Sequence, residues 1–485
     1  MVPYLRAANV TWRGIDLSDV KKMDFSVLEV ETYRLRTGDI LLAEASGSPS
    51  EVGKPAIYVE GSDTHCFQNT LIRVRSTSEV NRFLHAHFLR DVLLGRFAKT
   101  ARGVGIQHLG ADALSAWEIA LPPVGEQERI VEALDSYLTR LDDAVASLER
   151  AQAKLKAYRA SVLKAAVEGR LVPTEAVLAR AEKRDYEPAD VLLARILKER
   201  RHRWEEAELD RLKKAGKTPK DDKWTKKYEE PLTPDTTTLP QLPEGWRWAT
   251  VDMFGDVKGG LAKGQKRSPK ERLLEVPYLR VANVQRGYLD LSEVKTILAT
   301  AEEITELRLQ PGDVLFNEGG DRDKLGRGWI WSGEIAECIH QNHVFRVRLT
   351  GSDVEPRFVS WYGNSSGQRY FFDEGKQTTN LASINMTQLK SLPVPVPPSS
   401  EQARIVDEVE DRLSVVDEVV TSVTHDIQRC LRLRQAVLKW AFEGKLVDQE
   451  PSDEAAETLL ARLKAERAAA VPVTKANGRR RKGAA

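Results

Sequence analysis

Apolar residues recur every seven positions in two long stretches of the chain. The first stretch carries Leu134, Leu141, Leu148, Leu155 and Val162, interleaved with Val131, Leu138 and Val145; the second carries Val409, Val416, Val423, Cys430 and Val437, interleaved with Val406, Leu413, Val420 and Ile427. Sustained heptads of this kind are typical of coiled-coil packing. We therefore predict two long helices, over residues 125–170 and 400–446, with Gly169 and Gly444 as their stops.

Two other arrangements produce the same pattern: an ordinary bundle helix, or a seam between two copies of the chain. The matched phase of the two heptads favours antiparallel pairing within one chain, because a globular lobe lies between the two helices. The expected fold class is α+β, with two lobes joined by two long antiparallel helices in a dumbbell of pseudo-twofold symmetry.

Shorter apolar runs ahead of each long helix predict two lobes of mixed α/β structure. Strands are expected at residues 39–43, 56–59, 71–74, 314–316, 329–331 and 344–347, and short amphipathic helices at 81–95 and 355–367. Prolines at 121–123 and 393–398 are expected to stop the structure before each long helix. We place the first lobe at residues 1–124 and the second at 241–399.

The two lobes and their helices are copies of one unit. Residues 2–10 read VPYLRAANV and residues 276–284 read VPYLRVANV, identical at eight of nine positions. The motif Glu-Gln-x-Arg-Ile-Val begins at Glu126 and again at Glu401, and residues 159–172 and 434–447 share nine of fourteen residues. A tandem duplication is the direct explanation.

The copies are not equally complete. Residues 242–274, which include Leu-Pro-Glu-Gly-Trp-Arg-Trp at 242–248, have no counterpart ahead of the first VPYLR motif. We expect the first lobe to be N-terminally incomplete, either because the true start lies upstream or because the opening strand is missing. Loss of that strand would leave a sheet edge unpaired.

The remaining segments are rich in charge. Residues 171–240 are expected to form a charged helical connector with a solvated helix, the alternative being a docking surface for a partner subunit. Residues 447–485 are expected to form a short helix and a basic tail with non-specific affinity for phosphate. The net charge of +1 does not by itself indicate nucleic acid, and the three cysteines suit neither a disulfide framework nor a zinc cluster. We expect no membrane span and a cytoplasmic location.

The sequence contains no complete motif of the enzyme classes that it partly resembles. A P-loop has four residues between its first glycine and the Gly-Lys pair, but five residues separate Gly47 from Gly53-Lys54. The spacing from Gly259 to Gly264 is correct, but Gln265 stands where the P-loop lysine is required. The Glu-x-Lys at Glu293 resembles half of a nuclease site but has no preceding acidic partner, and its context predicts a turn. The Pro-Pro pairs lack the acid or amide of an amino-methyltransferase loop, and His65, His108, His340 and His343 show no ligand spacing. A stand-alone enzyme is therefore disfavoured.

Two divergent lobes, each followed by a near-repeated helix, resemble the specificity subunit of type I restriction–modification enzymes. The matching stretches are residues 242–248, 276–284 and 319–326 and both helix blocks, which end in Leu-Lys-x-Ala-x-Glu-Gly-Arg/Lys-Leu-Val. The resemblance implies that each lobe is a target-recognition domain for double-stranded DNA and that the chain has no active site. It also implies two methyltransferase subunits and restriction/translocase subunits as partners, which carry S-adenosylmethionine, ATP and magnesium, with no cofactor on this chain.

The copies diverge most at residues 43–54 against 317–327, and 96–109 against 368–384, inside a preserved frame. We expect base reading there, and hence an asymmetric, bipartite target with an undetermined gap. The candidate DNA contacts are Lys54, Lys99, Arg102, Gln107 and His108 in the first lobe, and Lys263, Lys266, Arg267, Arg322, Lys324, Arg327, Lys376, Gln377, Thr379 and Asn380 in the second. Lysines would mainly neutralise phosphate, and Arg, Gln and Asn can pair with base edges.

For each candidate an ordinary solvated surface position is the alternative, and the glycines of residues 319–328 can simply serve a hairpin turn with positive φ. Arg6, Asn9, Arg280 and Asn283 occur in both copies, so we assign them to the framework or to a common phosphate contact. Two rival functions stay open: a specificity chain whose partner fuses restriction to methylation, and a coiled-coil adaptor with protein- or sugar-binding lobes.

Overall fold

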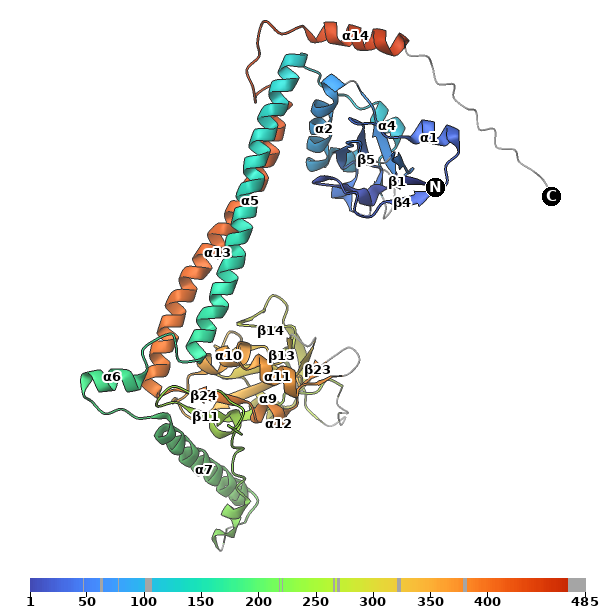
Figure 1. The fold of residues 1–485 in the computed structure, drawn as a ribbon. Helices are drawn as coiled ribbons and strands as arrows, with labels where there is room; N and C mark the ends of the chain where they lie inside the picture. The colour runs from blue at the N-terminus through green and yellow to red at the C-terminus, as the bar shows by residue number, and fades with distance from the viewer. Residues whose placement is uncertain are drawn as a thin grey trace, which may run out of the picture. The chain divides into compact units, whose positions relative to one another are not determined.

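The computed structural model divides the chain into two units, one formed by Met1–Ala151 with Ser422–Ala485 and the other by Gln152–Thr421 (Figure 1). It describes residues 1–469 except 47, 62–63, 77, 101–106, 218, 220, 265–266, 268–270, 321–323 and 378–381. Each unit contains one lobe together with part of both long helices, so each is described by itself.

The first unit contains lobe one. Its helices are α1 (Val27–Tyr33), α2 (Ser78–Leu93), α3 (Arg96–Thr100), α4 (Ala111–Ser115) and α14 (Ala456–Ala469), with parts of the long helices α5 (Val124–Val167) and α13 (Ser399–Ala441). Its strands are β1 (Val2–Leu5), β2 (Val10–Thr11), β3 (Gly14–Ile15), β4 (Lys21–Met23), β5 (Ile40–Ala43), β6 (Ala45–Ser46), β7 (Pro55–Ile57), β8 (Cys66–Phe67), β9 (Leu71–Val74) and β10 (Gln107–His108).

The second unit contains lobe two. Its remaining helices are α6 (Glu175–Glu182), α7 (Ala189–Lys214), α8 (Val251–Phe254), α9 (Ala301–Leu307), α10 (Pro356–Asn364), α11 (Gln368–Glu374) and α12 (Met386–Lys390). Its strands are β11 (Arg247–Thr250), β12 (Gly255–Lys258), β13 (Leu274–Leu279), β14 (Val284–Gln285), β15 (Tyr288–Leu289), β16 (Lys295–Ala299), β17 (Val314–Asn317), β18 (Gly319–Gly320), β19 (Gly328–Ile330), β20 (Ile339–His340), β21 (Val344–Leu349), β22 (Lys376–Gln377), β23 (Ala382–Ser383) and β24 (Pro393–Val396).

The two lobes repeat the same sheets. In lobe one the sheets are ordered β4-β1-β8 and β7-β5-β9, and in lobe two their counterparts are β16-β13-β20 and β12-β21-β17-β19. The VPYLR motif forms the central strand of the first sheet in each lobe, and it pairs in parallel with β8 or β20. Lobe two has additional pairing, because β12 extends the second sheet and β11 pairs with β24. The duplication is therefore structural as well as sequential.

Within each unit the long helices pack against each other in antiparallel fashion. In the first unit Ile130 and Leu134 of α5 share a buried cluster with Val437 and Leu438 of α13, and in the second unit Val162 of α5 does so with residues 405–409. Arg434 pairs with Asp142 in the first unit, and Arg159 pairs with Asp417 in the second. These two ion pairs occupy equivalent positions, which confirms the antiparallel pairing within the chain.

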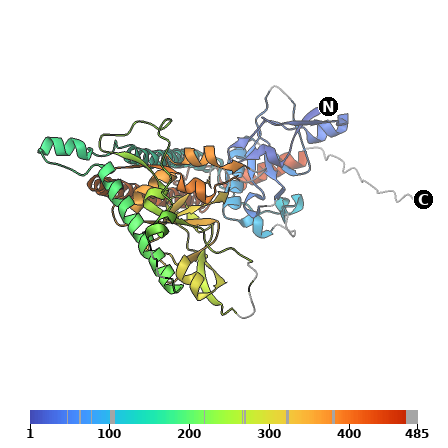
Figure 2. The ribbon, with the colours of Figure 1, turned by 90° about the horizontal axis from the view of Figure 1, so that it is seen from below.

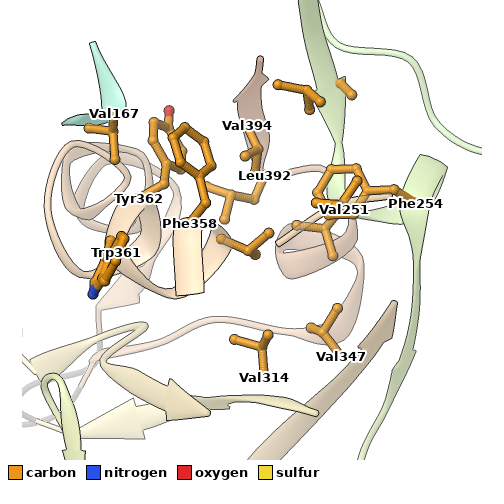
Figure 3. Close-up of a cluster of buried hydrophobic side chains, with 14 of the residues drawn as sticks. Val167, Val251, Phe254, Val314, Val347, Phe358, Trp361, Tyr362, Leu392 and Val394 are labelled. Atoms are coloured by element: carbon orange, nitrogen blue, oxygen red, sulfur yellow. The ribbon is translucent and has the colours of Figure 1, made fainter. Parts of the chain in front are cut away.

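The core of lobe two continues onto the end of α5. Val167 lies beside Trp361 and Tyr362 of α10, and the same cluster includes Val314, Val347 and the apolar strand β24 (Figure 3). Buried leucines of α7, Leu192 and Leu193, join this cluster, so α7 lies along lobe two (Figures 1 and 2). A long helix and its lobe are thus one packed body in this unit.

The glycines that follow the long helices both have positive φ, 67° at Gly169 and 66° at Gly444. A Cβ atom at Gly169 would lie 2.6 Å from Pro243 and 3.0 Å from Trp246, whereas at Gly444 the nearest atom, in Gln449, would be 3.9 Å away. The expected role of both glycines as helix stops is confirmed.

The strand predictions agree with the structure at β5, β7, β9, β17, β19 and β21, and the two predicted short helices correspond to α2 and α10. One strand was not predicted. Residues 393–398 were expected to stop the preceding structure, and α12 does end before them, but Pro393–Val396 also form strand β24 against β11. Proline is tolerated there because the sheet has only two strands, and Val394 and Val396 point into the core.

Candidate nucleic-acid interface

In lobe two the divergent segments meet in one small sheet. β18 and β22 flank β23, with Ser383 opposite both Gly319 and Lys376. The candidates Lys376 and Gln377 therefore belong to the same sheet as the Gly319-Gly320 segment, although about 56 residues separate them in the sequence. Arg322, Thr379 and Asn380 lie outside the described residues.

Lobe one uses the same arrangement at its divergent segments. β6 pairs antiparallel with β10, so that Ser46 lies opposite Gln107 and Ala45 lies opposite His108. His108 is exposed, as is Lys99 at the end of α3, and Arg102 lies outside the described residues. In both lobes, segments that differ between the copies are thus brought together beside sheets that the two lobes share.

The other candidates are mostly engaged within the protein. Lys54 is only 9% exposed; its ammonium pairs with Glu51 and lies 5.5 Å from the centre of the Trp12 ring. The Lys54 hydrogen bond holds the pKa of Glu51 below its ordinary value. The structure therefore offers Lys54 as an internal partner rather than as an open phosphate contact.

Arg267 and Arg327 also have partners in the protein. The Arg267 guanidinium lies 2.8 Å from both carboxylate oxygens of Glu303. Burial alone would raise the pKa of Glu303, but the hydrogen bonds from Arg267 and from the Thr300 backbone outweigh it and lower that pKa. Arg327 donates to the carbonyl of Val281 at 3.3 Å. Lys263 is exposed, Lys324 is half-buried, and Lys266 lies outside the described residues.

The glycine-rich hairpin has a structural requirement of its own. Gly326 has φ of 59°, and a Cβ atom there would lie 2.1 Å from the ring of Phe371. The hairpin interpretation is therefore confirmed for this glycine.

The residues repeated in both copies form the frame. The Asn9 and Asn283 amides each accept a backbone N–H, from Arg6 and Arg280, and each donates to two carbonyls of the following turn. Both asparagines are buried, so the framework assignment is confirmed for them. The arginines pair with acids in the same turns, Arg6 with Asp19 and Arg280 with Glu293.

A basic groove in the second unit escaped the sequence reasoning. It lies between the last turns of α5 and lobe two and is lined by Lys156, Arg159, Lys164, Arg286, Trp329 and Arg369, among others. Arg369 is 91% exposed, and Lys156 and Lys164 are also exposed. The available signal was the run of four cationic residues between positions 154 and 164, which is equally typical of the solvated outer face of a heptad helix. Glu168 also lines the groove, and Arg159, Lys164 and Arg369 each have an acidic neighbour. Five cations against one acid in the lining leave an excess of positive charge, which suits a phosphate backbone.

No cluster of three or more potential metal ligands occurs among the described residues. His340 is fully buried, its Nδ1 lies 2.6 Å from the carbonyl oxygen of Val344, and burial lowers its pKa to about 4. Among the same residues, no helix is both long and apolar enough to cross a membrane.

Comparison with known proteins shows which proteins the chain is similar to. The family model for the type I restriction modification DNA specificity domain matches residues 2–151. The specificity subunit of the type I restriction enzyme EcoKI from Escherichia coli K12 is 25% identical over 96% of this chain and 89% of its own length. The StySPI specificity subunit from Salmonella potsdam is 24% identical over the same shares.

Over nearly its whole length, the chain is similar to specificity subunits of type I restriction enzymes.

A solved chain from work on the complex assembly and conformational transition of the type I R-M system has the same fold. It matches with a TM-score of 0.58 at 16% identity and covers 92% of each chain. The family model matches lobe one and the first part of α5, and the internal repeat extends the correspondence to lobe two. The alternative of a coiled-coil adaptor for protein or sugar is correspondingly disfavoured.

Proposed function

We propose that this specificity subunit binds double-stranded DNA and that each lobe reads one half of a bipartite, asymmetric target. The observation that supports this most is the position of the divergent segments: in each lobe they meet in a small sheet, β18-β23-β22 or β6-β10, on a shared frame. Variable side chains on a rigid frame are what two different half-sites require.

The proposal includes the partners. The subunit itself has no catalytic role and no cofactor; it positions two methyltransferase subunits, which use S-adenosylmethionine, and restriction/translocase subunits, which use ATP and magnesium. The relatives support this by name, since they are specificity subunits of restriction enzymes. A partner that fuses restriction to methylation would leave the role of this chain unchanged.

The test is modified-base sequencing of DNA from cells that express this chain with its neighbouring methyltransferase subunit. We expect methylation at a split, asymmetric motif. Arg322→Ala or Asn380→Ala should weaken or relax one half of the motif only, because a bidentate base contact contributes about 1–3 kcal/mol of discrimination. The control is Arg308→Ala, whose guanidinium pairs with Glu337 on the surface of the same lobe. Equal loss at both halves would contradict separate readers.

The basic groove is proposed to contact the phosphate backbone without reading sequence. Lys156→Gln and Lys164→Gln should weaken binding to every target alike, and the slope of log affinity against log salt should fall by about one for each lysine replaced. Lys198→Gln, at an exposed lysine of α7, is the matched control and should leave the slope unchanged. A loss that depends on the sequence of the target would assign the groove to base reading instead.

A further inference from the structure

A histidine and a glutamate lie beside the small sheet in which the divergent segments of lobe two meet. Glu318 directly precedes β18, and His343 directly precedes β21. The backbone N–H of Glu318 donates to the carbonyl of His343 at 2.9 Å. The carbonyl of Glu318 accepts the N–H of Ile384, the residue after β23, at 2.8 Å. Backbone hydrogen bonds thus connect the position of His343 to the sheet for which DNA reading is proposed.

Lobe one has the same backbone arrangement with a different side chain. The N–H of Glu44 donates to the carbonyl of Thr70 at 3.0 Å, and the carbonyl of Glu44 accepts the N–H of Leu109 at 2.8 Å. The glutamate is therefore present in both copies, whereas Thr70 stands where lobe two has His343. The Thr70 hydroxyl accepts the backbone N–H of Ala7 at 3.3 Å. Different side chains at one backbone position are what two different half-sites require.

The side chains of His343 and Glu318 form a partly exposed pair. The Nδ1 atom of His343 lies 2.5 Å from the Glu318 carboxylate, and the two side chains are 54% and 28% exposed. A carboxylate accepts hydrogen bonds and donates none, so it holds the hydrogen on Nδ1 and leaves Nε2 as an acceptor. The amide nitrogen of Asn342 lies 3.3 Å from this Nε2 atom. An acceptor and an N–H donor are thus presented side by side.

This pair of groups matches one base edge in the major groove. Adenine offers its N6 amino group as a donor and N7 as an acceptor, whereas guanine offers two acceptors at the same places. The Nε2 atom of His343 can accept from the N6 amino group while the Asn342 amide donates to N7. The 3.3 Å contact between Asn342 and His343 is long for a hydrogen bond, so a base amino group can replace it.

We propose that His343 is a specificity-determining residue, whose Nε2 atom reads an adenine in the half-site of lobe two. Glu318 is its positioning residue, because it fixes the tautomer and the orientation of the imidazole ring. Asn342 supplies the second hydrogen bond to the same base. The inference rests on the proposed function, since it names a reader within a lobe that is proposed to bind DNA.

The test is modified-base sequencing of cells that express the chain with its neighbouring methyltransferase subunit. The variant His343→Thr copies lobe one. We expect it to accept other bases at one A·T position, with discrimination there reduced at least about fivefold and the other half of the motif unchanged. His202→Thr is the matched control, because His202 is also exposed and pairs with a glutamate, Glu206, at 3.4 Å on α7. It should leave every position of the motif unchanged.

A second variant tests the role of Glu318. Glu318→Gln keeps the shape of the side chain, but its amide can also donate to Nδ1 of His343, and Nε2 then carries the hydrogen. We expect the same position to lose part of its preference for adenine and to accept guanine, whose edge offers acceptors. An unchanged preference for adenine would contradict the positioning role. A loss of stability alone would not change the base that is preferred.

The outcomes separate this inference from the proposed function. Absence of a split motif with the unmodified chain would overturn both. A split motif that His343→Thr leaves unchanged, or that changes at a G·C position or in both halves, would overturn the inference alone. Anisotropy of duplexes that differ at the one base pair, with the purified complex of chain and methyltransferase subunit, measures the same discrimination without methylation. In that assay His343→Gln, which restores an acceptor, should retain more of the preference for adenine than His343→Thr.

Discussion

In both lobes a nearly fully buried aspartate pairs with an arginine at the equivalent position. A second arginine nearby has different partners in the two lobes. Asp39 pairs with Arg75 at 2.6 Å in lobe one, and Asp313 pairs with Arg348 at 2.7 Å in lobe two. The second arginine is Arg73 in lobe one and Arg346 in lobe two. Arg346 is buried and lies 2.8 Å from Asp256 of β12, whereas Arg73 lies 5.0 Å from the Phe67 ring centre and donates to two carbonyls.

The difference follows from the neighbouring strand. Lobe two has β12 beside β21, which both buries Arg346 and supplies its acidic partner, and lobe one has no such strand among its described residues. The Asp–Arg pair therefore belongs to the fold itself, while the second arginine adapts to its surroundings. Variants made at matched positions can separate these two kinds of residue.

The largest effect is expected from the buried aspartates. Asp39→Ala or Asp313→Ala leaves an arginine and a backbone N–H without their acceptor, and breaking a buried pair in this way costs about 3–5 kcal/mol. We expect each loss to be confined to its own lobe. Hydrogen exchange of each lobe in increasing urea measures it, with Asp373→Ala on exposed α11 as the control. A loss shared by both lobes would contradict two independent frames.

A pH effect is expected in lobe two from a histidine that lobe one lacks at the equivalent position. His340 in β20 stands where lobe one has Phe67, since both lie opposite the leucine of the VPYLR motif. Burial lowers the pKa of His340 to about 4, so between pH 6.5 and 4 the unfolded chain binds the proton more readily. Stability should fall by about 3 kcal/mol as the pH is lowered through this window.

The variant His340→Phe, which copies lobe one, should remove most of that pH dependence. The free energy of unfolding in urea, measured at pH 7 and pH 4.5 by hydrogen exchange in peptides of lobe two, gives this pH dependence. Burial also lowers the pKa of His85 in lobe one, so the control is lobe two of the unmodified chain measured at the same two pH values. An unchanged pH dependence in His340→Phe would assign the acid sensitivity to other residues.

The paired asparagines should give equal, intermediate effects. Asn9→Ala or Asn283→Ala removes one acceptor and two donors from a buried turn, and we expect a loss of about 2 kcal/mol in either lobe. Asn→Asp at the same positions keeps the acceptor and loses the donors, and it separates the two contributions. Markedly unequal losses would mean that the two turns are not the same element.

The smallest effects are expected on the long helices. Arg159→Ala and Arg434→Ala each remove a solvent-exposed ion pair, and exposed pairs contribute less than about 1 kcal/mol. Chemical denaturation in low and high salt checks this, because any contribution should decrease as salt is added. A loss of several kcal/mol in the free energy of unfolding at either position would mean that the pair contributes as much as a buried ion pair.

Much of the fold could be predicted because local patterns in the sequence determine its helices and strands. Strand β9 has the predicted bounds, Leu71–Val74, and α5 begins one residue before its predicted start. The helices α1 and α9 were not predicted, although Ser26 with Glu29 and Thr300 with Glu303 form the capping boxes that indicate a helix start. The local signal for both helices is therefore present in the sequence.

Other features depend on partners that are distant in the sequence. The parallel pairing of β1 with β8 joins residues 62 positions apart, Tyr4 and Cys66, and no local pattern names that partner. The burial of Lys54 depends on Trp12, and the pairing of Arg267 depends on Glu303. Charge alone predicted these two cations as DNA contacts because a sequence shows a charge but not what lies beside it.

The glycines after the two long helices show how a duplicated element loses its equivalence. Gly444 is restricted only by its positive φ, so asparagine, which tolerates that conformation, is an acceptable replacement. Gly169 is restricted by φ and also by Pro243 and Trp246, so no side chain fits there. Two positions that began as copies therefore drift under different constraints, and mutational tolerance at one cannot be read from the other.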